Sequence, residues 1–117
     1  MMRFTDTLKK NHEFRRLYSK GKSAAGALLV VYVRKTKRNT NRIGFTVSTK
    51  LGKAVTRNRV RRRLREIYRL HEAELRPGLE LVIVARGRAV GAEYRQLDQA
   101  FLSACKKLEL LREEGTA

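Results

Sequence analysis

The sequence predicts an α/β (α+β) two-layer sandwich, in which three helices pack against one mixed sheet of about four strands. Apolar, β-branched runs of strand length occur at 27–33, 42–48 and 79–85. Segments with helical spacing of apolar residues precede the first run, lie between the second and the third, and follow the third. A single Pro in 117 residues leaves these elements uninterrupted. The expected order is helix, strand, strand, an optional further strand, helix, strand, helix, within one domain spanning 1–117.

The first helix is expected to start at Asn11, because Asn is a favoured N-cap residue, and to stop before Gly21. Its length is roughly three turns. Strands follow at 27–33 and 42–48, and the second alternates apolar residues with smaller polar ones, so its two faces differ. Turn-favouring residues at 39–41 predict that these two strands pair as an antiparallel hairpin.

A long helix is expected from about 54 to 75, ended by the Pro-Gly pair at 77–78. Its buried stripe is predicted to consist of Val60, Leu64, Ile67 and His71. The strand at 79–85 is almost continuously apolar, which predicts a central place in the sheet. The last helix is expected over about 92–112. One of its faces carries Tyr94, Leu97, Phe101, Ala104, Leu108 and Leu111.

Net charge is the strongest functional signal in the composition. The chain has 28 Lys and Arg against 11 Asp and Glu, a formal net charge of +17. Self-repulsion of this size opposes a compact state and favours a polyanionic partner. No apolar run is long enough to span a bilayer, and the first residues lack the apolar core of a signal peptide. We therefore expect a nucleic-acid partner, no membrane, and a cytoplasmic protein whose single cysteine stays reduced.

An arginine-rich segment at 53–66 falls on the predicted long helix. Arginines recur every four residues from Arg57 to Arg69 and form one ridge on its surface. A solvated helix face, which is the plainer interpretation, normally mixes charges of both signs, and this one does not. Guanidinium groups bind phosphate oxygens in bidentate fashion and stack on bases. The pattern therefore predicts a helix that binds nucleic acid.

Phe14 and Tyr18 lie four residues apart and share one face of the first helix. Their spacing alone favours packing against the sheet. The alternative is a stacking surface for single-stranded nucleotides. Tyr32 supports the alternative modestly, because a groove floor is plausible on one face of the first two strands. That floor would consist of Val30, Tyr32, Thr46 and Ser48. Periodicity alone does not decide between the two interpretations.

The sequence offers no pattern for protein-based catalysis. His71 falls on the apolar stripe, where a structural role is expected. A single cysteine, Cys105, permits no Cys/His zinc pattern. The carboxylates are scattered, without the clustering of a two-metal nuclease site, and no glycine-rich nucleotide-binding motif is present. We expect no catalytic residue, no metal site and no organic cofactor in this chain.

Several motifs, in the right order, resemble the bacterial ribonuclease P protein family. They are Asn11-x-x-Phe14 with an aromatic at Tyr18, the run RIGFTVS at 42–48, the segment GKAVTRNRVRRRLRE at 52–66, and VIVAR at 82–86. The resemblance covers most of the chain, and the Arg-Asn-Arg run at 57–59 is specific. Tyr18 stands where Phe is common in the family, and Thr49 stands where Lys is common.

The resemblance implies a non-catalytic subunit of the ribonucleoprotein endonuclease that removes the 5′ leader from precursor tRNA. The implied partners are the catalytic ribonuclease P RNA, which performs the hydrolysis with magnesium, and precursor tRNA, with no protein partner required. The single-stranded leader would lie in a cleft that includes Phe14, Tyr18, Val30, Tyr32, Thr46 and Ser48. The segment bordering the catalytic RNA would include Lys53, Arg57, Asn58, Arg59, Arg61, Arg62 and Arg65. The implied fold is ribosomal-protein-like, with a left-handed strand–helix–strand crossover against the usual right-handed rule.

Two other classes of protein fit the same net charge. One is a purely structural RNA binder, such as a ribosomal or assembly protein, which would cofractionate with ribosomal subunits. The other is an architectural DNA binder, which would prefer duplex DNA to single-stranded RNA.

Overall fold

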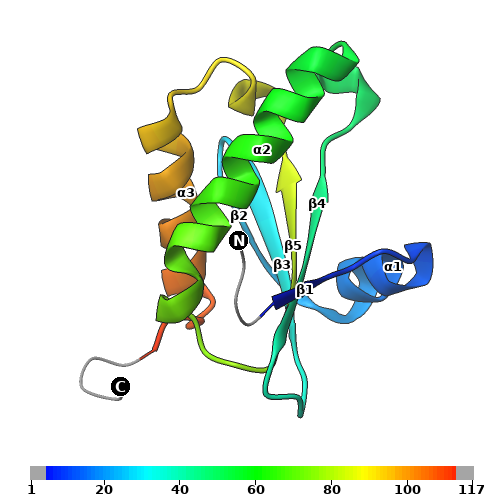
Figure 1. Cartoon of the computed structure of the whole chain (residues 1–117), viewed down its shortest axis with the longest axis vertical. Coiled ribbons are helices and arrows are strands. Elements are labelled where there is room, and N and C mark those ends of the chain that lie inside the picture. Colours follow the sequence, from blue (N-terminus) through cyan, green and yellow to red (C-terminus); the bar gives the residue numbers. More distant parts are fainter. Residues whose placement is uncertain (1–4, 113–117) are drawn as a thin grey trace.

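The structure, a computed structural model, describes residues 5–112, which form one five-stranded sheet and three helices (Figure 1). In chain order the elements are β1 (Thr5–Thr7), α1 (Asn11–Lys20), β2 (Lys22–Ala25), β3 (Leu29–Lys35), β4 (Asn41–Thr46), the single-turn helix η1 (Thr49–Leu51), α2 (Ala54–His71), η2 (Glu72–Glu74), β5 (Leu79–Ala85), η3 (Gly87–Ala89) and α3 (Tyr94–Lys107). The predicted class is confirmed, with five strands in place of about four. The strands missed from the sequence, β1 and β2, are three and four residues long, too short to show alternation.

The strand order across the sheet is β1-β4-β5-β3-β2. β5 is central, as its apolar sequence predicts, and pairs in parallel with β4 and in antiparallel orientation with β3. The predicted hairpin between 27–33 and 42–48 is therefore wrong, because β5 lies between the two strands concerned. β5 is buried along almost its whole length and needs neighbours on both edges. That requirement outweighs the turn preference of the residues between β3 and β4.

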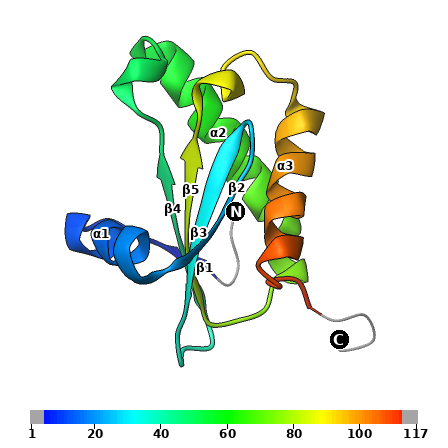
Figure 2. The ribbon, with the colours of Figure 1, turned by 180° about the vertical axis from the view of Figure 1, so that it is seen from behind.

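β4, α2 and β5 form a parallel crossover. In Figure 1 both strands run upward, and α2 passes in front of the sheet. β5 lies to the left of β4, so the chain moves leftward across the sheet. This path is left-handed, as the family resemblance implies and against the usual rule. Figure 2 shows the same path from behind. The consequence is that α2 stays in contact with β4, the strand from which it has just departed.

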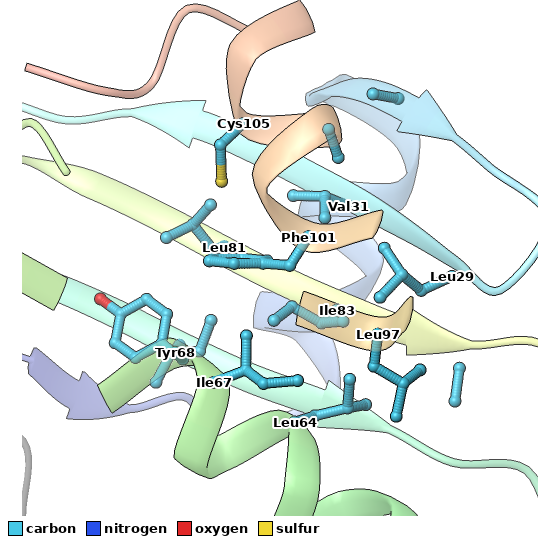
Figure 3. Close-up of a cluster of buried hydrophobic side chains, with 14 of the residues drawn as sticks. Leu29, Val31, Leu64, Ile67, Tyr68, Leu81, Ile83, Leu97, Phe101 and Cys105 are labelled. Atoms are coloured by element: carbon cyan, nitrogen blue, oxygen red, sulfur yellow. The ribbon is translucent and has the colours of Figure 1, made fainter. Parts of the chain in front are cut away.

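The main core lies between one face of the sheet and the helices α2 and α3 (Figure 3). Its buried side chains include Leu29, Val31, Leu64, Ile67, Tyr68, Leu81, Ile83, Leu97 and Phe101. Each fully buried aliphatic or aromatic side chain of this kind contributes about 1.5–3 kcal/mol to folding. The predicted stripe of α2 is confirmed at Val60, Leu64 and Ile67, whereas His71 is only partly buried.

α1 lies against the opposite face of the sheet from α2 and α3 (Figures 1 and 2). Leu17 is buried there with Leu8 and Val82 in a second, smaller apolar cluster. Val82 alternates along β5 with residues of the main core, which places this cluster on the other face. The N-cap of the helix is Lys10 and not Asn11, so the helix begins one residue earlier than predicted. The Lys10 backbone N–H donates to a Glu13 carboxylate oxygen over 3.1 Å.

The other predicted ends differ by a few residues. β3 and β4 occupy Leu29–Lys35 and Asn41–Thr46. α2 ends at His71, and the chain tightens into η2 before reaching β5. α3 ends at Lys107, where the backbone turns through Glu109 at a φ of 59°. Beyond it, Leu111 forms an isolated antiparallel bridge with Leu75, in the segment between η2 and β5.

Candidate nucleic-acid interface

A cleft of about 550 Å³ opens between α1, β4 and α2. It is lined by Asn11, Phe14, Arg15, Tyr18, Phe45, Thr46, Val47 and Arg61. The sheet makes this opening possible, because β1 pairs only with Asn41–Ile43 and leaves the C-terminal half of β4 as a free edge. The aromatic pair of α1 and one arginine of α2, which are far apart in the sequence, therefore face the same hollow.

Phe14 both packs on the sheet and lines the cleft. Its partly buried ring lies against the small cluster around Leu17. It also lies directly over Gly44, where an added Cβ would come within 2.6 Å of two ring carbons. Only glycine lets the ring approach β4 this closely. The two interpretations of Phe14 that the sequence left open therefore describe two sides of the same ring.

Tyr18 is the more exposed aromatic of the pair, with 39% of its surface accessible. Its hydroxyl is 2.8 Å from the Thr46 Oγ1 atom, a hydrogen bond that spans the cleft from α1 to β4. Its ring meets Tyr32 edge to face at a centroid distance of 5.0 Å. Tyr32 thus supports Tyr18 from the sheet and does not itself line the cleft.

Two further residues expected in the cleft lie outside its lining. Val30 is on β3, and both it and Thr46 are paired with Val84 of β5, so one strand separates them. Ser48 is exposed beyond the end of β4, where its hydroxyl accepts a hydrogen bond from the Lys50 backbone N–H over 3.2 Å and caps η1. The structure therefore brings together Phe14, Tyr18 and Thr46 from the expected set.

Sequence reasoning missed Asn11 and Arg15 as lining residues. With Phe14 and Tyr18 they follow the i, i+3, i+4, i+7 spacing of one helix face, so the signal was present. Phe45 and Val47 belong to the apolar set of the alternating strand at 42–48, and Val47 is buried. They reach the cleft because no neighbouring strand covers this part of β4, and strand alternation carries no information about that.

A second hollow, of about 560 Å³, runs along the exposed side of α2. It is lined by Val55, Asn58, Arg61, Arg62 and Arg65. An Arg61 Nη1 donates to Asn58 Oδ1 over 3.2 Å, which holds that guanidinium along the helix. Arg57 instead donates from Nε to the Gly52 carbonyl over 3.1 Å, while Lys53 and Arg59 are exposed outside this lining. Arg61 lines both hollows and so joins the cleft to the hollow along α2.

No acidic side chain lines either hollow in the described part of the chain. Within residues 5–112, the arginine ridge has an acidic partner only at its C-terminal end, where Arg69 donates two hydrogen bonds to Glu66, of 2.5 and 3.0 Å. The hydrogen bonds from Arg69 hold the pKa of the Glu66 carboxyl below its ordinary value. The N-terminal part of α2 therefore presents positive charge without an acidic neighbour. Such a surface attracts phosphate groups.

The histidine and the cysteine singled out in the sequence have structural surroundings. His71 links Glu74 through Nδ1 to Asp98 through Nε2, the latter over 2.6 Å. Burial opposes its protonation, but the hydrogen bonds that the imidazole donates to the two carboxylates outweigh burial and raise the pKa of His71. Cys105 is buried in the main core, and that burial raises the pKa of its thiol to about 12.

Between residues 5 and 112, no group of three or more His, Cys, Asp or Glu is arranged to hold a metal ion. Over the same residues, no helix combines the length and apolar character needed to cross a bilayer.

Comparison with known proteins places this architecture. The sequence model of a family described as Ribonuclease P matches residues 2–109. The ribonuclease P protein component of Alkaliphilus oremlandii is 43% identical over 110 residues, covering 94% of this chain and 96% of that protein. The Staphylococcus aureus RNase P protein structure superimposes with a TM-score of 0.83 at 32% identity, covering 91% and 97% of the two chains. The Thermotoga maritima protein gives 0.77 at 27% identity, covering 94% and 99%. The chain therefore belongs to the ribonuclease P protein family.

Proposed function

We propose that this chain binds the single-stranded 5′ leader of precursor tRNA in the cleft between α1, β4 and α2. As a member of its family, the chain is a protein component of ribonuclease P, a ribonucleoprotein endoribonuclease of tRNA processing. The observation that carries the proposal is the convergence of Phe14, Tyr18 and Arg61 on one open hollow. Aromatic rings stack on unpaired bases, and a guanidinium binds the phosphate between them.

The hollow along α2, lined by Asn58 and three arginines, suits the larger RNA partner, the ribonuclease P RNA. Asn58, Arg62 and Arg65 face solvent along one side of the helix, without an acidic neighbour in the hollow they line. Structured RNA presents dense phosphate charge at its surface, which such a ridge binds with little dependence on sequence. Because Arg61 lines both hollows, the leader and the catalytic RNA would meet at this residue.

The division of labour follows from these roles. The catalytic RNA, with magnesium, performs the hydrolysis, and the protein holds the substrate leader next to it. No organic cofactor and no further protein partner enter this scheme. The whole chain acts as one RNA-binding domain in the cytoplasm. The family match disfavours both a ribosomal protein and an architectural DNA binder.

Reconstitution with the ribonuclease P RNA tests the proposal. At low magnesium concentration, the protein should raise the rate of precursor-tRNA cleavage, and the gain should be larger for substrates that carry a leader long enough to enter the cleft. Mature tRNA serves as the binding control, because it lacks the leader. The proposal fails if the protein gives no gain in cleavage, or if its contribution to affinity is the same with and without a leader.

A further inference from the structure

A network of four charged side chains lies under α1, at the start of β4 and β5. Glu80 of β5 is buried between Arg34 of β3 and Arg42 of β4, its direct partners on the two neighbouring strands. An Nη atom of each arginine lies 3.0 and 3.4 Å, respectively, from a Glu80 carboxylate oxygen. The Arg42 guanidinium also forms an ion pair with Glu13 of α1. The network therefore connects the sheet to the helix.

Glu13 makes two separate contacts with its two carboxylate oxygens. Oε1 accepts the hydrogen bond from the Lys10 backbone N–H that caps α1, and Oε2 forms the ion pair with Arg42. Burial opposes ionisation of the carboxyl group, but the hydrogen bonds from Lys10 and Arg42 outweigh burial and hold the pKa of Glu13 below its ordinary value. The side chain is thus a charged group that ties the first turn of α1 to β4.

The other contacts of α1 with the sheet restrict its orientation less. Leu17 is held by burial in the small apolar cluster, and burial has no preferred direction. The hydrogen bond between Tyr18 and Thr46 is directional, but it is exposed, so water competes for both hydroxyl groups. The ion pair of Glu13 with Arg42 is directional and largely buried, and the Glu80 carboxylate holds the guanidinium from its other side. This ion pair therefore restricts how α1 can roll or slide on the sheet.

The ion pair lies beside the contact that places the aromatic ring of the cleft. Glu13 precedes Phe14 in the chain, and Arg42 is two residues from Gly44, over which the Phe14 ring lies. Residues two apart in a strand share one face of the sheet. A rotation of α1 at Glu13 would therefore move the ring along β4 and change the shape of the cleft that the ring lines.

We propose that Glu13 is a positioning residue for the cleft, which sets the orientation of α1 through Arg42 and so presents Phe14 and Tyr18 to unpaired bases. Glu13 touches no RNA in this role. The role rests on the proposed function, because the leader must bind in the cleft. It has a distinctive sign: a carboxylate raises the affinity for a polyanion, whereas its direct interaction with phosphates is repulsive.

The test removes the charge of Glu13 and retains the cap. Glu13→Gln keeps an oxygen for the Lys10 N–H, since Gln serves at this position of a capping box as Glu does, but it loses the ion pair with Arg42. Arg34→Gln is the matched control, because Arg34 pairs with the same Glu80 and with no described residue of α1. Each variant is reconstituted with the ribonuclease P RNA and bound to precursor tRNA and to mature tRNA. The ratio of the two affinities is the leader gain.

Glu13→Gln should reduce the leader gain by about fivefold, the lower end of what one stacked base contributes. Arg34→Gln should leave the leader gain unchanged, and urea unfolding checks that both variants are folded. Glu13→Gln also makes the protein more positive, so an effect of net charge alone would strengthen the binding of both RNAs. A selective loss for the precursor therefore separates positioning from electrostatics.

Amide hydrogen exchange of the free protein is a second readout that does not depend on RNA. The amides of α1 should exchange faster in Glu13→Gln, while those of β5 should exchange as in the unmodified protein. Unchanged exchange of α1 would overturn the role of Glu13. An equal loss of leader gain in Arg34→Gln would also overturn it, because the gain would then follow the stability of the sheet.

The same measurements separate this role from the proposed function. If the unmodified protein shows a leader gain that Glu13→Gln retains in full, only the role of Glu13 fails. If the unmodified protein shows no leader gain, the proposed function fails and the role of Glu13 fails with it.

Discussion

Phe14 illustrates how a single side chain serves both the fold and the surface. One side of its ring lies over Gly44 and the small cluster of α1, and the ring also lines the open cleft. A stacked base would therefore rest on a ring that the sheet already holds in position. Such a ring loses little conformational entropy on binding, which favours affinity.

Replacing Phe14 with alanine should selectively weaken binding of precursor tRNA relative to mature tRNA. The expected loss is about 1–3 kcal/mol, the contribution of one stacked base. Phe14→Leu is the matched control for packing, since it retains most of the buried apolar volume without an aromatic face. Binding of both RNAs by the reconstituted enzyme, together with urea unfolding of each variant, checks this. Unfolding of Phe14→Ala combined with full leader binding by Phe14→Leu would show that the ring only packs.

Arg61 differs from its neighbours because it lines both hollows. Arg61→Ala should weaken binding of the catalytic RNA and also reduce the extra affinity that a leader provides. Arg65→Ala, which lines only the α2 hollow, should weaken binding of the catalytic RNA alone. Each lost phosphate contact should lower the salt slope by about 0.7–0.9. If both variants reduced the extra affinity from the leader equally, Arg61 would have no special role in joining the two hollows.

At the scale of elements, the position of α1 over the sheet depends on a glycine in β4. Gly44→Ala would place a Cβ within 2.6 Å of the Phe14 ring. The ring must then move, and overpacking of this kind costs about 1–3 kcal/mol. Urea unfolding should show that loss, and the loss should shrink when Phe14 is already alanine, because the clash is then absent. Equal costs of Gly44→Ala in both backgrounds would mean that the two residues do not press on one another.

The sequence predicted the burial of individual helices and strands better than it predicted how they pair and meet. The helical stripe of α2 and the apolar run of β5 predicted their burial correctly, because side-chain periodicity directly reflects contact with a core. The pairing of β3 with β4 was predicted wrongly, because sheet order depends on which strand most needs two neighbours. The meeting of α1 and the sheet in one cleft was implied by the family resemblance, but the contribution of α2 to that cleft was not predicted. It depends on how far β1 extends along β4. Tyr18 and Thr46 were expected in one cleft, but the hydrogen bond between them has no local signature.

His71 fastens the C-terminal end of α2 to α3 through its hydrogen bond to Asp98. Because its carboxylate partners raise the pKa of His71 above the ordinary value of 6.5, the protonated form is favoured in the folded state. Its contribution to stability is therefore complete below the unfolded pKa and is lost as the pH rises through the folded pKa. Urea midpoints should fall across this window above about pH 6.5. Asp98→Asn should flatten that fall, and an unchanged profile would contradict the assigned cause.

For the molecule as a whole, positive charge is distributed around a compact core. The 28 Lys and Arg exceed the 11 Asp and Glu by enough to give +17, and the strongest local excess lies on α2. The carboxylates that are ion-paired in the described part include Glu66 with Arg69, and Glu80 with both Arg34 and Arg42. Such local pairs leave most of the net charge without a counter-charge within the protein. Counter-charge from RNA phosphates would therefore stabilise the folded chain as well as form the complex.

Salt should then act in opposite directions on the free protein and on the complex. Added salt screens self-repulsion, so the thermal midpoint of the free chain should rise between low and physiological ionic strength, as the Debye length shortens from about 30 to 8 Å. The same salt competes with phosphate contacts, so affinity for the ribonuclease P RNA should fall linearly on a log–log scale. Both measurements belong in one buffer series with sodium chloride as the only variable. A midpoint that stays constant while affinity falls would show that self-repulsion does not limit the stability of the free chain, and that its charge serves RNA binding alone.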